Sequence, residues 1–258
     1  MLLGSGREPP KLEPPLMSQI VEWAVLALTA LFASTLAAVT GFGGAAVLLP
    51  VLVAAFGVRE AIPILTVAQL IGNGSRVWFN RQEVHWRVVA WFAVGGVPMA
   101  LLGGYLFAKA PLGFLTRLLG AFLLLIVAWR HLRPRQAKPF PTATFAGIGA
   151  GASFLSALLG SVGPIMAPFF LGYGLVKGAY IGTEALSTVV MHVTKLVAYR
   201  QTAVLTGAAV LIGLALGPIM VFGSWLGKRI VDRLPEKVFI AIIEGVLIVA
   251  GTLFLVRG

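Results

Sequence analysis

Residues 40–50 read TGFGGAAVLLP and place three glycines within four positions, between two strongly hydrophobic runs. Glycine lets the backbone turn or unwind where a side chain would clash. A related stretch, LGSVGP, returns at residues 159–164 and again precedes a short hydrophobic run. Its Pro164 suits the first turn of a helix, where the missing amide hydrogen is not needed. We interpret each stretch as a break at which a new helix begins.

The composition excludes a water-soluble protein. The chain has 258 residues, of which 59% are hydrophobic and 11% are charged, and its mean hydropathy is +0.95. Soluble globular domains carry about 25% charged residues. Several runs exceed the ~18 apolar residues that are enough to cross a bilayer. The sequence therefore predicts an all-α polytopic membrane protein surrounded by lipid.

The net charge of +11 comes from 20 basic and 9 acidic residues. In a soluble protein this excess would indicate a nucleic-acid partner. Here the basic residues lie mostly in short connections between hydrophobic runs, where the positive-inside rule explains them, so we expect no nucleic acid. The absence of cysteine excludes disulfides, thiolate metal sites and cysteine nucleophiles. We predict no metal and no cofactor.

The hydrophobic residues form ten segments, five on each side of a basic linker at residues 133–141. The segments are 18–40, 44–57, 61–80, 86–108, 112–132, 142–160, 164–175, 178–199, 203–226 and 236–257. The first membrane repeat is thus predicted at 18–132 and the second at 142–258. Residues 1–17 are interpreted as a disordered tail, with Met17 as an alternative start of the protein.

The two halves repeat at a shift of 163 − 44 = 119 residues. The matches at this shift are Gly44 with Gly163, Arg76 with Lys195, and Arg81-Gln82 with Arg200-Gln201. One residue further on, GGYL at 103–106 matches GSWL at 223–226. Internal matches of this kind indicate a duplicated architecture.

Five crossings per half would give the two halves opposite orientations in the membrane. If all ten segments cross, most loop lysines and arginines, including Arg81, Arg87 and Lys228, fall on one side. The positive-inside rule assigns that side to the cytoplasm. We therefore expect a multi-pass protein of the cell inner membrane with both termini outside. If the short segments dip in and return, the basic loops spread more evenly.

The short segments 44–57 and 164–175 span only about 18–21 Å as helices, whereas the hydrocarbon core is ~30 Å thick. We therefore predict that both begin inside the membrane. The first amide groups of a helix have no partner within it, and together with the helix dipole they favour an anion. Paired helix starts near the midplane recur in transporters with inverted repeats.

The predicted binding residues in these breaks are Gly41, Gly43, Gly44, Gly160, Ser161 and Gly163. The alternative is that the glycines only allow close helix packing, because small residues are enriched where membrane helices touch.

A polar stripe follows one face of the third segment in each half. Gln69, Asn73 and Arg76 form the first stripe, and the shift of 119 relates them to Thr188, His192 and Lys195. Ionised groups at membrane depth cost about 3 kcal/mol or more unless they are paired or hydrated. We predict that the six residues line an anion site. The alternatives are snorkelling of Arg76 and Lys195 to the headgroups and a hydrogen-bonded structural role for His192.

Two residues of the second stripe are candidate proton carriers. Histidine titrates near neutral pH, which makes His192 one candidate, and Glu184 is the other. Glu184 and Lys195 lie ~16 Å apart along the axis of one helix, which excludes a direct pair. Glu244 in the last segment is a weaker candidate, because the corresponding segment of the first half contains no acidic residue.

The glycine-rich turn before a short proline-containing segment, present in both halves, resembles the TauE/SafE family of sulfite exporter-like permeases. The motifs that carry the resemblance are GFGG at 41–44 with Pro50 and GSVG at 160–163 with Pro168. The resemblance covers about residues 18–257 and implies transport of small sulfur-containing anions, such as sulfite or organosulfonates.

The leading hypothesis is a secondary transporter of a small anion, without enzymatic activity. No Walker A sequence is present, so ATP hydrolysis by this chain is not expected. One alternative is an intramembrane hydrolase using Ser161 and His192, although no Gly-x-Ser-x-Gly motif surrounds Ser161. The other is a structural membrane protein without transport. A homodimer is compatible with each of these hypotheses, and the sequence does not indicate the oligomeric state.

Overall fold

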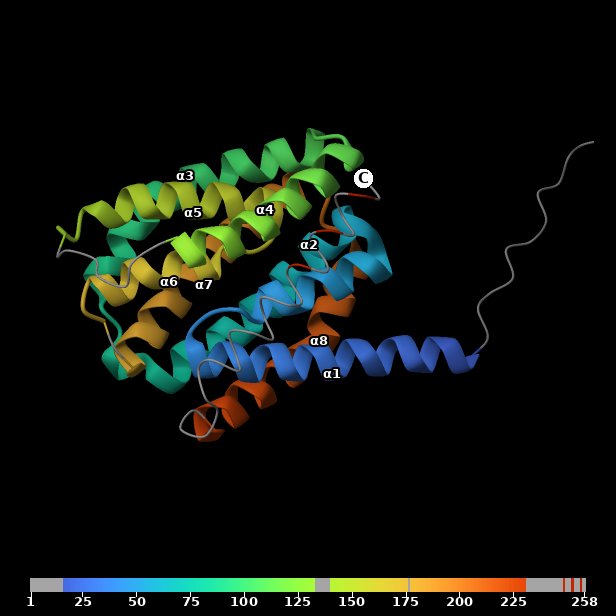
Figure 1. Ribbon diagram of the computed structural model, residues 1–258, viewed down its shortest axis with the longest axis horizontal. Coiled ribbons are helices and arrows are strands. Elements are labelled where there is room, and N and C mark those ends of the chain that lie inside the picture. The colour runs from blue at the N-terminus through green and yellow to red at the C-terminus, as the bar shows by residue number, and fades with distance from the viewer. Residues whose placement is uncertain are drawn as a thin grey trace, which may run out of the picture.

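The computed structural model describes residues 16–132, 140–175 and 177–230, together with the isolated positions 248, 252 and 256. The described chain forms helices joined by short turns and contains no strand (Figure 1). The helices are α1 (Leu16–Thr40), α2 (Gly44–Asn80), the 3-10 helix η1 (Arg81–Glu83), α3 (Trp86–Lys109), α4 (Leu112–Leu132), α5 (Thr144–Leu159), α6 (Gly163–Gly172), α7 (Lys177–Gln201) and α8 (Gly207–Ile230).

The helices agree with nine of the predicted segments and differ in detail. Segments 44–57 and 61–80 follow each other within α2 as two helices, and a non-helical conformation at Gly57, with φ 75° and ψ 163°, separates them as predicted. The segment predicted at 203–226 begins later, at Gly207, because residues 202–206 form a turn. Most of the predicted segment 236–257, with Glu244, most of the tail 1–17 and most of the linker 133–141 lie outside the described residues.

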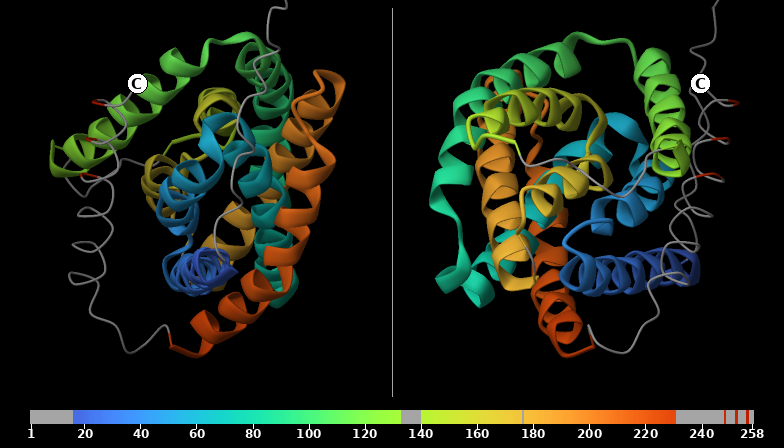
Figure 2. Two further views of the ribbon diagram at one scale, coloured as in Figure 1. Left: turned by 90° about the vertical axis from the view of Figure 1, so that its right-hand side faces the viewer. Right: turned by 60° about the vertical axis from the view of Figure 1, so that its left-hand side comes forward.

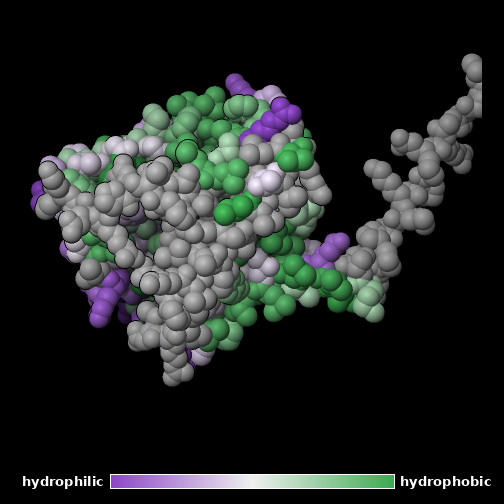
Figure 3. All heavy atoms as spheres, viewed as in Figure 1, coloured by the Kyte–Doolittle hydropathy of each residue, from purple (hydrophilic) through white to green (hydrophobic). Residues whose placement is uncertain are grey.

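Within the described residues, four helical stretches are long and apolar enough to cross a membrane: Ile20–Thr40, Gly44–Glu83, Trp86–Lys109 and Gly207–Arg229. Large hydrophobic side chains on them, such as Leu28 and Leu211, are exposed at the molecular surface. Hydrophobic residues also dominate the visible surface along α1 in Figure 3. Such a surface is stable only against lipid or protein, and the molecule is an all-α polytopic membrane protein.

The helices of the two halves interlock. The first helix of each half packs on the fourth segment of the other, so that α1 lies against α8 and α5 against α3. The central helices α2 and α7 pack on each other between these two pairs (Figures 1 and 2). Gly103 approaches Phe154 of α5, and Gly223 approaches Leu31 of α1, closely enough that a methyl group would meet a backbone carbonyl in each case. The two glycines that matched in sequence therefore make equivalent helix contacts.

Two contacts between distant residues identify the two ends of the helix assembly. At one end Arg59 donates to the carbonyl oxygens of Ala108 (3.2 Å) and Ala110 (2.6 Å). At the other end Lys228 donates to the carbonyl oxygen of Phe79 at 2.8 Å. Residues 59 and 109 therefore lie near one end and residues 79–81 and 228 near the other, which is the grouping that the loop-charge prediction uses.

Candidate functional site

The glycine-rich turn between α1 and α2 requires glycine at two positions. Gly41 has φ 76° and Gly43 has φ 94°, which is the left-handed region that side chains disfavour. A methyl group on Gly41 would also overlap the ring of Tyr180. The turn is further held by the Thr40 hydroxyl, which donates to the carbonyl oxygen of Phe42 at 2.7 Å. The chain thereby reverses and begins α2 at Gly44.

The second turn reverses the chain between α5 and α6 with less glycine. Gly160 repeats the left-handed conformation with φ 83°. Val162, which replaces Gly43 at the shift of 119, has an ordinary φ of −140° before α6 begins. A Cβ atom placed on Gly163 would lie 3.2 Å from Cβ of Phe42 and 3.7 Å from the amide nitrogen of Gly43. The two turns therefore meet, and the starts of α2 and α6 are brought together as the sequence predicts.

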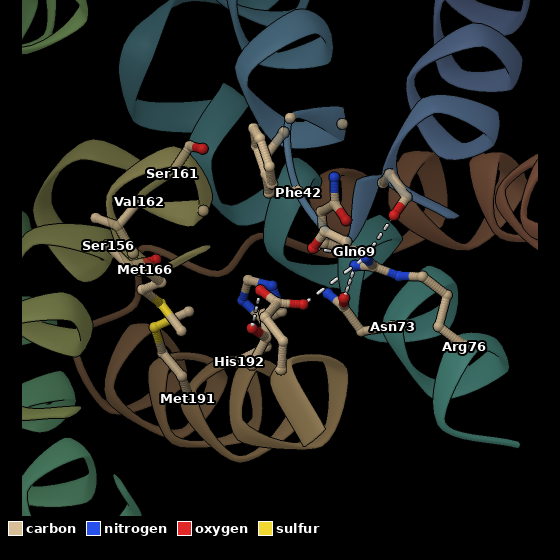
Figure 4. Close-up of a pocket in the computed structure, with 18 of the residues that line it drawn as sticks. Phe42, Gln69, Asn73, Arg76, Ser156, Ser161, Val162, Met166, Met191 and His192 are labelled. Carbon is tan, nitrogen blue, oxygen red and sulfur yellow. Dashed lines mark hydrogen bonds and ion pairs between the residues drawn. The ribbon is translucent and has the colours of Figure 1, made fainter. Parts of the chain in front are cut away.

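A small cavity lies where the turns meet the polar stripes of α2 and α7 (Figure 4). It offers about 40 Å³ of space to water-sized molecules, whereas one buried water needs about 10–15 Å³. Figure 4 shows Gln69, Asn73 and Arg76 on one side of the cavity, Met166 and Met191 on the other, and His192 between them. The lining residues are Ala37, Gly41, Phe42, Gly43, Gly44, Ala45, Gln69, Asn73, Arg76, Ser156, Gly160, Ser161, Val162, Gly163, Met166, Glu184, Thr188, Met191 and His192.

Arg76 is held in the cavity wall by neighbouring acceptors. Its side chain is buried, and Nη1 donates to the carbonyl oxygens of Ala37 (3.0 Å) and Gly41 (3.1 Å) at the end of α1. Nη2 donates to Oδ1 of Asn73. A guanidinium group fixed in this way presents its charge in one geometry, which suits recognition of an oxyanion.

Glu184 joins this arrangement from the second half. Its Oε2 lies 3.8 Å from Nη1 of Arg76, and its Oε1 accepts a hydrogen bond from the hydroxyl of Thr188 at 3.0 Å. The pair links α2 to α7 beside the cavity. Sequence reasoning named both residues but missed their pairing, because nothing in the repeat pattern relates positions 76 and 184.

Lys195 lies behind the cavity wall and does not line the cavity. It is completely buried, and its Nζ donates to Oγ of Ser156 at 3.2 Å. The snorkelling alternative is therefore wrong for both cations, because Arg76 and Lys195 point into the protein and make their hydrogen bonds there.

Three polar atoms of cavity-lining side chains have no hydrogen-bond partner in the described chain. They are Nε2 of Gln69, Nδ1 of His192 and Oε2 of Glu184, which lies 3.8 Å from Nη1 of Arg76, and all three side chains are about 3% exposed. A buried polar atom without a partner costs about 1–3 kcal/mol. Their position in a polar cavity points to a bound water or a polar ligand. The alternative of a fully hydrogen-bonded structural role for His192 does not fit the free Nδ1 atom.

The structure brings eleven of the twelve predicted binding residues, and Glu184, to the cavity wall, with Lys195 one hydrogen bond away. Sequence reasoning missed Ser156 and the apolar part of the lining, which includes Phe42, Met166 and Met191. The shift of 119 was the available signal for Ser156. It relates Ser156 to Ala37 at the end of α1, just before the first glycine-rich turn, and both residues line the cavity.

The chemistry of the lining, with a fixed guanidinium and two helix starts, suits a small anion. No group of three or more His, Cys, Asp or Glu side chains that would hold a metal occurs in the described residues. Ser161 and His192 both line the cavity, but no hydrogen bond between them exists in this part of the chain. The wall instead combines a fixed guanidinium, two helix starts and free amide and imidazole nitrogens.

Comparison with known proteins identifies the family of the chain. Residues 26–254 match the protein family described as Sulfite exporter TauE/SafE, and the chain belongs to this family of membrane permeases. Comparison with curated proteins and with solved structures yields no match.

Proposed function

We propose that this member of the TauE/SafE family is a secondary transporter that binds a small sulfur oxyanion, such as sulfite or an organosulfonate, in the cavity between the two glycine-rich turns. The anion would contact the starts of α2 and α6 and the guanidinium of Arg76. The proposal rests on the family membership, which supplies the transport class, and on the cavity, which supplies a binding site.

The observation that carries the binding site is the convergence of hydrogen-bond donors on one small cavity. Free amide groups at a helix start favour an anion, and a fixed arginine recognises oxygen atoms in a planar geometry. Nε2 of Gln69 adds a donor that has no partner in the described chain. The cavity volume of about 40 Å³ suits an anion with few heavy atoms.

Proton coupling is proposed to involve Glu184, with His192 as a second carrier. Glu184 is the counter-ion of Arg76 in this structure, so an incoming anion competes with it for the same guanidinium. Protonation of the carboxylate would release Arg76 for the substrate. Proton and anion would then move together.

The membrane orientation is proposed from the loop charges, with η1 and the start of α7 facing the cytoplasm and both termini outside. Because the chain has no cysteine, single cysteines at the exposed positions Gln82 and Lys109 provide a clean test. A membrane-impermeant maleimide added to intact cells should label Lys109→Cys and leave Gln82→Cys unlabelled. The opposite pattern would reverse the orientation.

Transport itself is tested by the flux of labelled sulfite and methanesulfonate into liposomes that contain the purified protein. Wild type is expected to exceed empty liposomes, and Arg76→Ala is expected to reduce the flux at least 10-fold, because a hydrogen bond to a charged group contributes about 1.5–3 kcal/mol. Arg81→Ala is the matched control, since Arg81 is exposed and does not line the cavity. Equal flux in wild type and Arg76→Ala would remove Arg76 from the site, and no flux of any small anion would refute the transporter.

A further inference from the structure

Ser156 is the one serine of α5 that lines the cavity, and Lys195 reaches it from behind. The side chain is completely buried, and its Oγ accepts a hydrogen bond of 3.2 Å from Nζ of Lys195. In Figure 4 Ser156 lies beside Val162 and Met166, across the cavity from Arg76. The residue thus stands between a buried cation and the space where an anion would bind.

The hydroxyl hydrogen of Ser156 has no acceptor in the described chain. A serine hydroxyl donates one hydrogen bond and accepts up to two, whereas a lysine ammonium only donates. Oγ therefore acts as the acceptor toward Lys195, and its own hydrogen is left for another partner. Other helical hydroxyls here donate to the preceding turn, as Thr66 does to Ile62 and Ser187 to Thr183. Ser156 makes no such bond among the described residues.

We propose that Ser156 is an anion-binding residue, which donates its hydroxyl hydrogen to the bound oxyanion, and that Lys195 is a positioning residue that acts through it. The ammonium occupies a lone pair of Oγ, turns the hydrogen toward the cavity and strengthens the hydroxyl as a donor. This inference rests on the proposed anion site and adds to it a second anchoring point, opposite Arg76.

The repeat supports this division of roles. Lys195 corresponds to Arg76 and Ser156 to Ala37 at the shift of 119. Arg76 lines the cavity itself and donates two hydrogen bonds to backbone carbonyl oxygens, those of Ala37 and Gly41. Lys195 does not line the cavity, and a hydroxyl replaces the carbonyl as its acceptor. In the second half, the buried Lys195 therefore acts on the cavity through Ser156, whose hydroxyl can donate a hydrogen bond into the cavity.

Independent support for a ligand comes from the same cavity. Nε2 of Gln69 and Nδ1 of His192 are buried there without partners in the described chain. A ligand that accepts from Gln69 and Ser156 would satisfy both the free Nε2 of Gln69 and the hydroxyl hydrogen of Ser156. A purely structural role for Lys195 is also costly, because a buried ammonium with one neutral acceptor has lost most of its hydration.

The test measures sulfite and methanesulfonate binding to the full-length protein in detergent by isothermal titration calorimetry, together with the melting temperature. The variants are Ser156→Ala, Ser156→Thr, Lys195→Met and the double variant Ser156→Ala/Lys195→Met. We expect Ser156→Ala to raise Kd about 10-fold, as for loss of a hydrogen bond to a charged group, and Ser156→Thr to retain most of the affinity. Lys195→Met is expected to weaken binding while raising the melting temperature. Because Lys195 acts through Ser156, the double variant should bind no more weakly than Ser156→Ala alone.

Ser153→Ala is the matched control. Ser153 lies one turn away on α5, is equally buried and has an unpartnered hydroxyl, but it does not line the cavity. Its Kd should equal that of wild type. If Ser156→Ala does not fold, Ser156→Cys replaces it, because a thiol is a weak donor of similar size.

The possible outcomes separate this inference from the proposed function. Wild-type affinity in Ser156→Ala would refute the role of Ser156 while leaving the anion site intact. If the increase in Kd of the double variant equals the product of the increases in the two single variants, the positioning role of Lys195 is refuted. If wild type binds none of the anions, the proposed function fails and this inference fails with it.

Discussion

Arg76 in the first half and Lys195 in the second occupy corresponding positions, and both are buried, yet their surroundings differ. Arg76 has two carbonyl oxygens, the Asn73 side chain and the carboxylate of Glu184 around it. Lys195 has the hydroxyl of Ser156. The duplicated sequence thus places a cation twice, while only the first copy acquires a counter-charge in the described chain. The comparison shows that a repeated residue does not imply a repeated role.

The largest expected effect comes from removing one partner of the Arg76–Glu184 pair. Arg76→Ala leaves the Glu184 carboxylate buried without its cation and should cost about 3–5 kcal/mol of stability. Adding Glu184→Gln should restore much of this loss. Lys195→Met, by comparison, should not reduce the stability of the protein. Thermal unfolding in detergent, followed by intrinsic fluorescence, measures all three. Equal destabilisation by Arg76→Ala and Lys195→Met would mean that the two cations are equivalent after all.

The two glycine-rich turns provide the next contrast. Gly41→Ala combines a positive φ with overlap of the Tyr180 ring and should cost about 2–4 kcal/mol. Gly160→Ala also has a positive φ, but its nearest neighbour is Cδ2 of Leu49 at 3.1 Å, at the end of a flexible side chain. We expect about 1–2 kcal/mol there. The melting temperature should decrease more in Gly41→Ala than in Gly160→Ala. A larger decrease in Gly160→Ala would contradict the difference in packing.

The two halves should behave alike at the glycines that follow their short helices. Gly57 ends the first part of α2 with φ 75°, and Gly174 follows α6 with φ 97°. A methyl group at either position meets nothing within 4 Å. Alanine should therefore cost only the backbone strain, about 1–3 kcal/mol at each site; at Gly57 the combination of φ 75° and ψ 163° is almost restricted to glycine. Thermal unfolding of Gly57→Ala and Gly174→Ala tests this, and a much larger loss at one of them would reveal a contact specific to that half.

The smallest effect on stability is expected at Gln69. Gln69→Leu replaces an amide whose Nε2 has no partner in the described chain, so the ligand-free protein should change by less than about 1 kcal/mol or gain stability. Sulfite should nevertheless stabilise this variant less than wild type, because the donor to the anion is gone. Melting curves with and without sulfite measure the difference. An unchanged sulfite effect would exclude Gln69 from the site.

Much of the fold followed from patterns along the chain. Runs of apolar residues located nine of the ten predicted segments, since a lipid-facing helix admits few charges. The glycines at 41–44 and 160–163 located the two reversals, because positive φ angles favour glycine. The spacing of Gln69, Asn73 and Arg76 placed them on one helical face, and all three line the cavity. The end of the first short segment was also predicted at residue 57, where Gly57 has a non-helical conformation that divides α2.

The sequence alone determined that this chain is a helical membrane protein with two related halves and a polar interior, because hydropathy, helical period and glycine conformation act over short stretches of chain. Only the tertiary structure decided which polar groups meet. The pairing of Arg76 with Glu184, the contact of Lys195 with Ser156 and the free nitrogens of Gln69 and His192 depend on how α1, α2, α5 and α7 pack. These are contacts between residues far apart in sequence, and their geometry is fixed by the packing of whole helices rather than by any local pattern.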